Sequence, residues 1–527
     1  MIFEQKLIFR EKKIREGDLV LTLDAGDWYS GSLYDQLGAD DRTNSVPQME
    51  FFHDAGYDGI ILGNHDFDRH ESALFAMLYK ANNMMLNINV FVSNLILPLP
   101  KESKFNLFYE PSSSVKFIPY LIKESAHGRV GVLGYMTPDA LFVSNDYRED
   151  LQFVGYSFPG GNKYEDLIEM ASKQSSMLKD KLKCDLVVVV IHGGHLDDED
   201  VGFLNLPDVD IVLGGHTHES YFYAGSDTSL TSQCGFAGIQ LTSLSIGMDS
   251  ERNLHFRGGN EDFDVSSRIP QCIHVTSKMK QNDAFDKKVA LWNGEMNELF
   301  NYNLDKTIFR GNLTQIFQEK STQEVNALNF AHMLVDEINK WEQKNRPSIS
   351  DPITLTFWNK DFLGHDQIEN RDLSDVILTF DDAYSLIFLP ATKDLYTFYV
   401  RKEDIYYILQ GMFVLNKVVS PLLTVSAGGI LYDETIYFGK IPLITNLRTV
   451  NNLPYKSWPP FVRMLTNSVT APYFWKFEKF SHGILNNIPR DKTGNVVIQE
   501  QAHMPYYPNE LELFFNYLGS LSVMNEN

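Results

Sequence analysis

Short apolar runs alternate with amphipathic segments along the first half of the chain. The apolar runs predict strands at 18–24, 59–62, 90–95, 129–134, 185–191 and 209–213. Apolar residues at turn spacing predict helices at 6–16, 46–55, 71–82 and 163–183. The run 185–191 is apolar throughout, which is typical of a strand covered on both faces. This alternation predicts an α/β layered domain over residues 1–275.

The second half of the chain has a different pattern. A Trp-containing helical stretch is expected to connect two domains over residues 276–305. A second helix is predicted at 324–340. Beyond residue 351 the chain is richer in Tyr and Phe, with short strands predicted at 353–357, 395–400 and 422–426. We therefore expect a smaller α/β (α+β) C-terminal domain over residues 306–520.

Composition narrows the class of protein. The chain has 527 residues, enough for two or three domains of about 100 to 200 residues each. Hydrophobic residues make up 43% and charged residues 22%, which excludes a disordered chain or a coiled coil. Lys and Arg total 46 against 69 Asp and Glu, and the net charge of -23 repels polyphosphate backbones. We therefore expect no nucleic-acid partner, which disfavours a nucleic-acid-cleaving function.

The cysteine count and the lengths of the apolar runs disfavour a disulfide framework, a signal peptide and a transmembrane helix. The 3 cysteines are too few for a disulfide framework. The first residues lack the apolar core and cleavage pattern of a signal peptide. No uninterrupted apolar run approaches the ~18 residues of a transmembrane helix, so no transmembrane segment is expected.

Polar side chains follow several of the predicted strands at their exits. The candidates for metal binding are Asp27, Asn64, His192, His216 and His218. Ligands of open α/β sheets gather at the carboxyl ends of strands, so we expect these side chains to converge. Oxygen and imidazole donors without a thiolate suit Zn, Mn, Fe or Co. Each residue alone could equally be a hydrogen-bonded loop residue, and the prediction therefore depends on the set.

The motifs at these exits resemble those of the calcineurin-like metallophosphoesterases, specifically the 5'-nucleotidase branch with its own C-terminal domain. The matching segments are 23–27, 63–68, 93–95, 192–195 and 214–218. Their order and spacing agree over nearly the whole first domain. The resemblance implies a four-layer β-sandwich flanked by helices.

The resemblance also implies a metal assignment with two divalent cations. The position matched by Asp27 bridges both cations. Those matched by Asn64, His192 and His216 complete one site, and that matched by His218 belongs to the other.

The catalytic roles come from the same resemblance. His65 and Asp68 match a catalytic dyad, in which the histidine stabilises developing charge or protonates the leaving group and the aspartate orients its ring. Asn94 lies in a matching segment and is expected to bind substrate. The implied reaction is in-line attack on phosphorus by a metal-activated water.

Two features depart from the family pattern. Family members begin with a strand whose Asp-x-His motif supplies two ligands to the cation that the His218 position also binds. No Asp-x-His occurs upstream of Asp27. Either the sequence is part of a longer protein, or the chain holds one metal and has lost its activity. In the second domain the expected base-stacking aromatics are missing. Tyr473 and Phe474 are candidates to replace them, with core packing as the alternative.

We expect metal-dependent hydrolysis of a small phosphorylated substrate, most simply a nucleotide. The alternative is a catalytically silent binding or scaffold protein that keeps the two-domain fold. The predicted location is secreted, vacuolar or at the cell surface if an upstream segment carries a signal peptide, and cytoplasmic otherwise.

Overall fold

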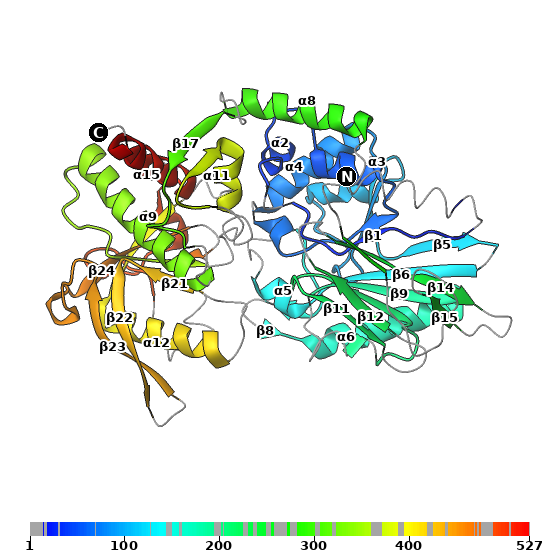
Figure 1. The fold of residues 1–527 in the computed structure, drawn as a ribbon. Coiled ribbons are helices and arrows are strands. Elements are labelled where there is room, and N and C mark those ends of the chain that lie inside the picture. Colours follow the sequence, from blue (N-terminus) through cyan, green and yellow to red (C-terminus); the bar gives the residue numbers. More distant parts are fainter. Residues whose placement is uncertain are drawn as a thin grey trace. The chain divides into compact units, whose positions relative to one another are not determined.

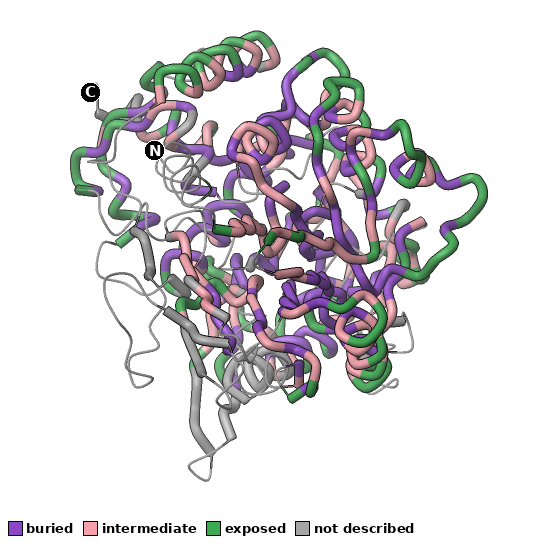
Figure 2. The backbone as a smooth tube through the Cα atoms, turned by 90° about the vertical axis from the view of Figure 1, so that its right-hand side faces the viewer, coloured by how far each residue is buried: buried purple, intermediate pink, exposed green. Residues whose placement is uncertain are grey.

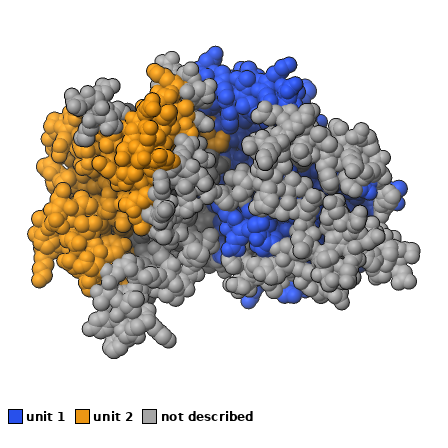
Figure 3. All heavy atoms as spheres, viewed as in Figure 1, with its two compact units in different colours: residues 1–30, 34–300 blue, residues 31–33, 301–527 orange. Residues whose placement is uncertain are grey.

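The chain folds into two compact units (Figures 1 and 3). Unit 1 comprises residues 1–30 and 34–300, and unit 2 comprises residues 31–33 and 301–527. The computed structural model describes residue 14 and residues 18–29, 32–68, 70–126, 128–143, 150–157, 161–193, 202–203, 205–224, 230–235, 240–248, 254–257, 271–274, 282–300, 306–318, 323–359, 372–387, 395–418, 425–437, 441–467, 470–471, 474–475, 488–504 and 507–525.

Unit 1 contains two large sheets. In the described residues the first sheet is parallel and has the order β1-β2-β3-β4. Its strands are β1 (Leu23–Asp24), β2 (Gly59–Ile60), β3 (Ile88–Phe91) and β4 (Val115–Ile118). The second sheet has the order β11-β12-β10-β9-β6-β5, with a parallel centre and antiparallel edges. Its strands are β5 (Leu121–Ser125), β6 (Gly128–Met136), β9 (Leu186–His192), β10 (Ile211–Gly214), β11 (Ser220–Ala224) and β12 (Leu230–Cys234).

Helices cover the outer faces of both sheets (Figure 1). The α-helices of unit 1 are α2 (Asp35–Ala39), α3 (Pro47–Asp54), α4 (His70–Asn83), α5 (Pro138–Val143), α6 (Tyr164–Ser176) and α8 (Asp283–Phe300). Shorter helical turns are η1 (His65–Phe67), η2 (Lys104–Tyr109) and the π-helical η3 (Met177–Lys181). Short strand pairs are formed by β7 (Tyr156–Ser157), β8 (Gly161–Asn162), β13 (Gln240–Ser243), β14 (Ser245–Met248), β15 (Leu254–Arg257) and β16 (Gln271–His274).

Alternate side chains of the strands point to opposite faces of a sheet, and each face packs against a different layer of unit 1. In β9, Val187 and Val189 pack with α6 on the outer face, whereas Val188 and Val190 face the other way. Val188 and Val190 share a core with Ile61, which follows β2 of the first sheet. Successive strand residues point to opposite faces, so the one strand contributes to two cores. Figure 2 shows the buried residues running along the strands. Unit 1 is therefore a helix, sheet, sheet, helix sandwich, as the four-layer prediction requires.

The two sheets touch where β3 ends. Ser93 donates its N–H to the Gly134 carbonyl at 2.6 Å, and the Gly134 N–H donates to Ser93 Oγ at 2.9 Å. Asn94 donates through Nδ2 to the Met136 carbonyl at 2.8 Å and accepts from the Met136 N–H at 3.2 Å. These bonds hold the carboxyl ends of β3 and β6 together, and the side-chain donors and acceptors replace a strand ladder there.

Unit 2 is built on a five-stranded sheet of order β21-β18-β24-β20-β25. Its elements are β17 (Thr307–Gly311), α9 (Gln323–Asn345), β18 (Leu355–Asn359), β19 (Val376–Thr379), α11 (Phe380–Leu386), β20 (Leu395–Arg401), α12 (Lys402–Val418), β21 (Val425–Gly428), β22 (Ile430–Tyr437), β23 (Ile441–Thr449), η6 (Tyr455–Ser457), β24 (Phe461–Asn467), α14 (Gln499–Ala502), β25 (His503–Met504) and α15 (Glu510–Asn525). Within it, Arg463 makes a two-pronged ion pair with Glu342, both side chains being buried.

Several element boundaries differ from those predicted from the sequence. The strand expected at 18–24 is reduced to β1, and the helix expected at 6–16 lies outside the described residues except for Ile14. The connecting helix α8 packs within unit 1, where Trp292 is 3% exposed and Lys288 forms ion pairs with Glu50 and Asp54. The predicted domain limits at 275 and 305 stay predictions. Among the helices of the described residues, none has the length and hydropathy that a bilayer crossing requires.

Substituting Gly134 by Ala tests how closely the sheets approach each other. An added Cβ would overlap the Phe91 carbonyl oxygen, so we expect unfolding free energy to fall by about 1–3 kcal/mol, the usual cost of overpacking. Urea denaturation measures the change. Gly294 in α8 is the control, because a Cβ there meets nothing within 4 Å. Gly294→Ala should leave stability unchanged or raise it, and an equal loss in both variants would contradict the prediction.

Candidate metal centre and active site

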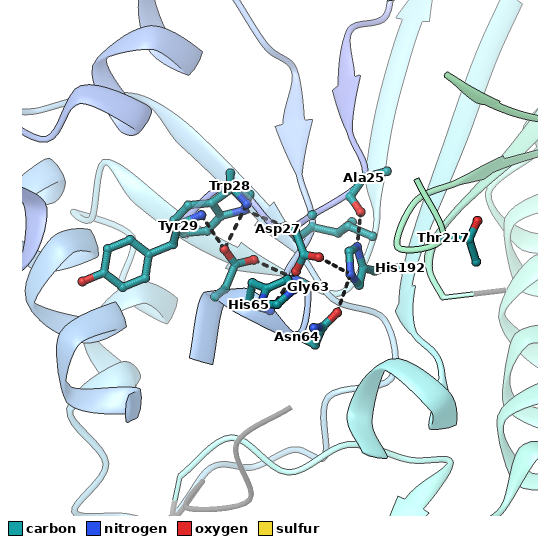
Figure 4. A network of polar contacts seen from close by, with 12 residues as sticks. Ala25, Asp27, Trp28, Tyr29, Gly63, Asn64, His65, His192 and Thr217 are labelled. Atoms are coloured by element: carbon teal, nitrogen blue, oxygen red, sulfur yellow. Dashed lines mark hydrogen bonds and ion pairs between the residues drawn. The ribbon is translucent and has the colours of Figure 1, made fainter. Parts of the chain in front are cut away.

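Strand ends from both sheets of unit 1 supply the candidate residues. The exits of β1 and β2 lead into Asp27 and Asn64, and the exits of β9 and β10 carry His192 and His216. Parallel strands present their carboxyl ends on the same edge of a sheet, so distant parts of the chain meet there. Figure 4 shows Asp27, Asn64 and His192 pointing toward one another.

His192 is held with one ring nitrogen directed into this cluster. It is 1% exposed, and its Nδ1 lies 2.6 Å from the Ala25 carbonyl oxygen. A carbonyl accepts only, so Nδ1 donates and the neutral imidazole keeps a lone pair on Nε2. Nε2 lies 2.9 Å from Asn64 Oδ1 and 3.0 Å from Asp27 Oδ2. Three acceptor atoms therefore meet at one point, which requires a second proton on His192 or a cation among them.

His216 completes this group of acceptors. One ligand atom from each of Asp27, His192 and His216 lies within 4.8 Å of the others. The Nε2 of His216 and the Oδ2 of Asp27 are buried, and neither makes a hydrogen bond within the described part of the chain. Burial and the neighbouring His192 lower the pKa of His216 to about 3, so its ring is a neutral base. These orphaned acceptors fit a divalent cation held by Asp27, Asn64, His192 and His216.

The backbone at the ligands is held in an unusual conformation. Asp27 has φ 62°, His216 has φ 76° and His218 has φ 60°, in the left-handed region that few non-glycine residues adopt. Such strain persists only where surrounding contacts fix it, and it is concentrated at functional sites. Gly63 also has no room for a side chain, because a Cβ there would overlap Asp27 Oδ1.

His65 and Asp68 form a pair beside the cluster. His65 Nδ1 donates to Asp68 Oδ2 at 2.8 Å, and the His65 backbone N–H donates to Asp27 Oδ1 at 2.8 Å. Burial alone would lower the pKa of His65, but Asp68 and then Asp27 raise it to about 10. For Asp27 the directions are reversed: burial alone would raise the pKa of this carboxyl, but His192 and then His65 lower it below its usual range. The site thus pairs an ionised carboxylate with a protonated imidazole.

His218 lies on the same loop as His216 but outside the group of three ligands. It is exposed, whereas His216 is partly buried. The buried amide of Gln233 holds this loop when its oxygen faces the backbone donors, accepting from the N–H of His218 at 3.0 Å and of Glu219 at 3.1 Å. The role of His218 as a ligand of a second cation stays a prediction.

The expected substrate-binding residues fall in three different settings. Asn94 is fully buried, and both its amide oxygen and its amide nitrogen bond backbone groups of unit 1. Phe474 is 2% exposed and packs against Phe357 and Phe398, as the core alternative requires. Tyr473 lies outside the described residues. Substrate contact by any of the three stays a prediction.

Asp66 is a residue that the sequence did not single out. It is fully buried and accepts three backbone N–H groups, from Trp28 at 3.1 Å, Tyr29 at 2.9 Å and Gly63 at 2.7 Å. The segment 63–68 carries two carboxylates, and nothing in its spacing shows which one is buried. The only signal in the sequence for a role of Asp66 is its position between the candidate residues of segment 63–68.

Comparison with curated proteins finds 5'-nucleotidases. Snake venom 5'-nucleotidase from Gloydius brevicauda is 29% identical over 226 residues, which cover 42% of this chain and 33% of that protein. The 5'-nucleotidase of Vibrio cholerae is 27% identical over 216 residues, or 39% and 33% of the two chains. The chain thus spans about a third of the length of these curated relatives. No family model matches the chain.

Solved structures share the whole fold. A 5'-nucleotidase precursor from Thermus thermophilus aligns with TM-score 0.68 at 17% identity, covering 99% of this chain and 90% of that one. A putative 5'-nucleotidase from Staphylococcus aureus aligns with TM-score 0.63 at 14% identity, covering 98% and 91%. At these identities the structures show the fold alone, and they confirm the predicted two-domain α/β fold class. The chain is thus similar in sequence to 5'-nucleotidases over about two fifths of its length, and it has the fold of solved 5'-nucleotidases over nearly all of it.

Proposed function

We propose that the chain is a metal-dependent phosphoesterase that hydrolyses a nucleotide. The observation that carries the proposal is the meeting of ligand atoms from Asp27, Asn64, His192 and His216 beside the His65–Asp68 pair. This arrangement combines a cation site with a proton donor, the two elements that phosphate-ester hydrolysis needs.

The cation site is proposed for Zn, Mn, Fe or Co, since its donors are oxygens and imidazoles. A divalent cation there would activate water and offset charge on phosphoryl oxygens. Asp27, Asn64, His192 and His216 supply the ligands for one cation. A second cation, with His218 and Asp27 as ligands, is implied by the family resemblance alone.

The chain's own groups supply the proton and the orientation. His65 is 27% exposed at its side chain, so the edge of the ring that does not face Asp68 reaches solvent. With Nδ1 bonded to Asp68, Nε2 carries the proton that His65 gives to the leaving-group oxygen or shares with a phosphoryl oxygen. Asp68 orients the ring and keeps it charged. No covalent intermediate on the protein is required.

The nucleotide substrate is supported by the names of the curated relatives, which are 5'-nucleotidases. The net charge of -23 opposes a polynucleotide substrate, because the summed field repels extended phosphate backbones. A small nucleotide held through a cation avoids most of that repulsion. The compartment stays a prediction; the relatives include a snake venom protein.

Phosphate release from a panel of nucleoside 5'-monophosphates, measured on the purified full chain with Mn or Zn added, tests the proposal. We expect turnover that a chelator abolishes and the metal restores. Binding of the cation without turnover of any nucleotide would overturn the proposal and leave a binding protein.

Replacing His65 by Ala tests the proton donor. We expect kcat to fall by about 10²-fold or more, the usual contribution of a general acid. The matched control is His53 on α3, whose Nδ1 accepts the N–H of Asn87 at 3.2 Å. His53→Ala should retain turnover, and an equal loss of kcat in both variants would remove His65 from the mechanism.

The raised pKa of His65 predicts a pH-dependent stability. Its pKa moves from 6.5 to about 10, so the pair with Asp68 stabilises the fold fully below about pH 6.5 and loses this effect as the pH rises toward 10. We expect the difference in unfolding free energy between wild type and Asp68→Asn to shrink across that range. Urea denaturation at stepped pH values with chelator present measures it, and a difference that is constant with pH contradicts the assignment.

A further inference from the structure

Asp66 joins the two loops that carry ligands from the first sheet. Its Oδ1 accepts the N–H groups of Trp28 and Tyr29, the two residues that follow Asp27. Its Oδ2 accepts the N–H of Gly63, the residue that precedes Asn64. One carboxylate thus fixes the backbone on the far side of Asp27 and on the near side of Asn64.

A reciprocal bond runs the other way between the same loops. Asp27 Oδ1 accepts the N–H of His65 at 2.8 Å, so each loop supplies a carboxylate to the other loop's backbone. The Trp28 indole adds a further bond, from Nε1 to the Ile61 carbonyl at 2.8 Å. Together these bonds surround Asp27, whose φ of 62° needs a surrounding structure that fixes it.

The chemistry of Asp66 suits this position better than an amide would. Three N–H donors point at two carboxylate oxygens, and both oxygens accept. An asparagine side chain at this position would offer one oxygen and would direct its NH₂ group at a backbone N–H, where neither can accept. Asp66 is fully buried, so water does not replace the lost bond.

We propose that Asp66 is a positioning residue that sets the distance between Asp27 and Asn64 and thereby the affinity of the cation site. The inference rests on the proposed function, because it needs Asp27 and Asn64 to be ligands. Asp66 itself touches neither cation nor substrate and acts through the two loops.

Asp66→Asn replaces one carboxylate oxygen by an NH₂ group and leaves the side chain nearly the same size. Asp210→Asn is the matched control: Asp210 Oδ2 accepts the Val187 N–H at 2.7 Å and pairs with Lys179 at 2.7 Å. It precedes β10, at the opposite end of that strand from His216. The control substitution therefore removes a comparable carboxylate bond from the same unit without altering the ligand loops.

Co²⁺ alone is the probe, titrated into chelator-treated wild type and both variants and followed by visible absorbance. We expect Asp66→Asn to weaken Co²⁺ binding by about 10- to 100-fold, as loss of a ligand-orienting partner does, and Asp210→Asn to bind as wild type. Melting temperatures without metal should fall by similar amounts in the two variants.

Co²⁺ binding by Asp66→Asn within about twofold of wild type would overturn the proposal. Failure of Asp66→Asn to fold, while Asp210→Asn folds, would also overturn it, because Asp66 would then support the domain as a whole. Wild type that binds Co²⁺ but releases no phosphate would refute the proposed function and leave the positioning role standing. Wild type that binds no Co²⁺ would end both.

Discussion

Mutual repulsion among acceptor atoms is the constraint on which the site depends. His192 donates from Nδ1 to the Ala25 carbonyl, and its Nε2 faces the oxygens of Asn64 and Asp27 at 2.9 and 3.0 Å. His216 adds a further buried nitrogen with no bond in the described chain. A fold keeps such atoms together only if something positive stabilises them. Asp68 and then Asp27 raise the pKa of His65, so one of the same acceptors also acts on the neighbouring imidazole.

The architecture explains why this cluster forms. Parallel strands of two sheets end at one edge, and Ser93 with Asn94 bonds the sheets to each other there. His192 then reaches from the end of β9 to Ala25, which follows β1. The cluster is thus a product of the sandwich itself, and its ligand loops are fixed by buried polar groups of both sheets. Stability and site geometry are therefore linked through a few hydrogen bonds.

Much of this could be predicted from the sequence, because strand exits are visible as apolar runs that stop at polar residues. The α/β class followed from that pattern and the resemblance to 5'-nucleotidases from the motifs, and the structure brings Asp27, His192 and His216 together. Burial of individual polar residues could not be predicted. Asp66 and Asp68 look alike in the sequence, yet one bonds three backbone N–H groups and the other bonds His65. Nor does the sequence show that the Asn94 amide bonds backbone groups, which it does through both its oxygen and its nitrogen.

Anomalous diffraction from crystals of the protein grown with Mn or Zn is the most direct test of the cation site. We expect a strong peak about 2.0–2.3 Å from Asp27 Oδ2, Asn64 Oδ1 and the facing nitrogens of His192 and His216. Crystals that show ordered side chains at these positions and no peak among them, at saturating metal, would contradict it.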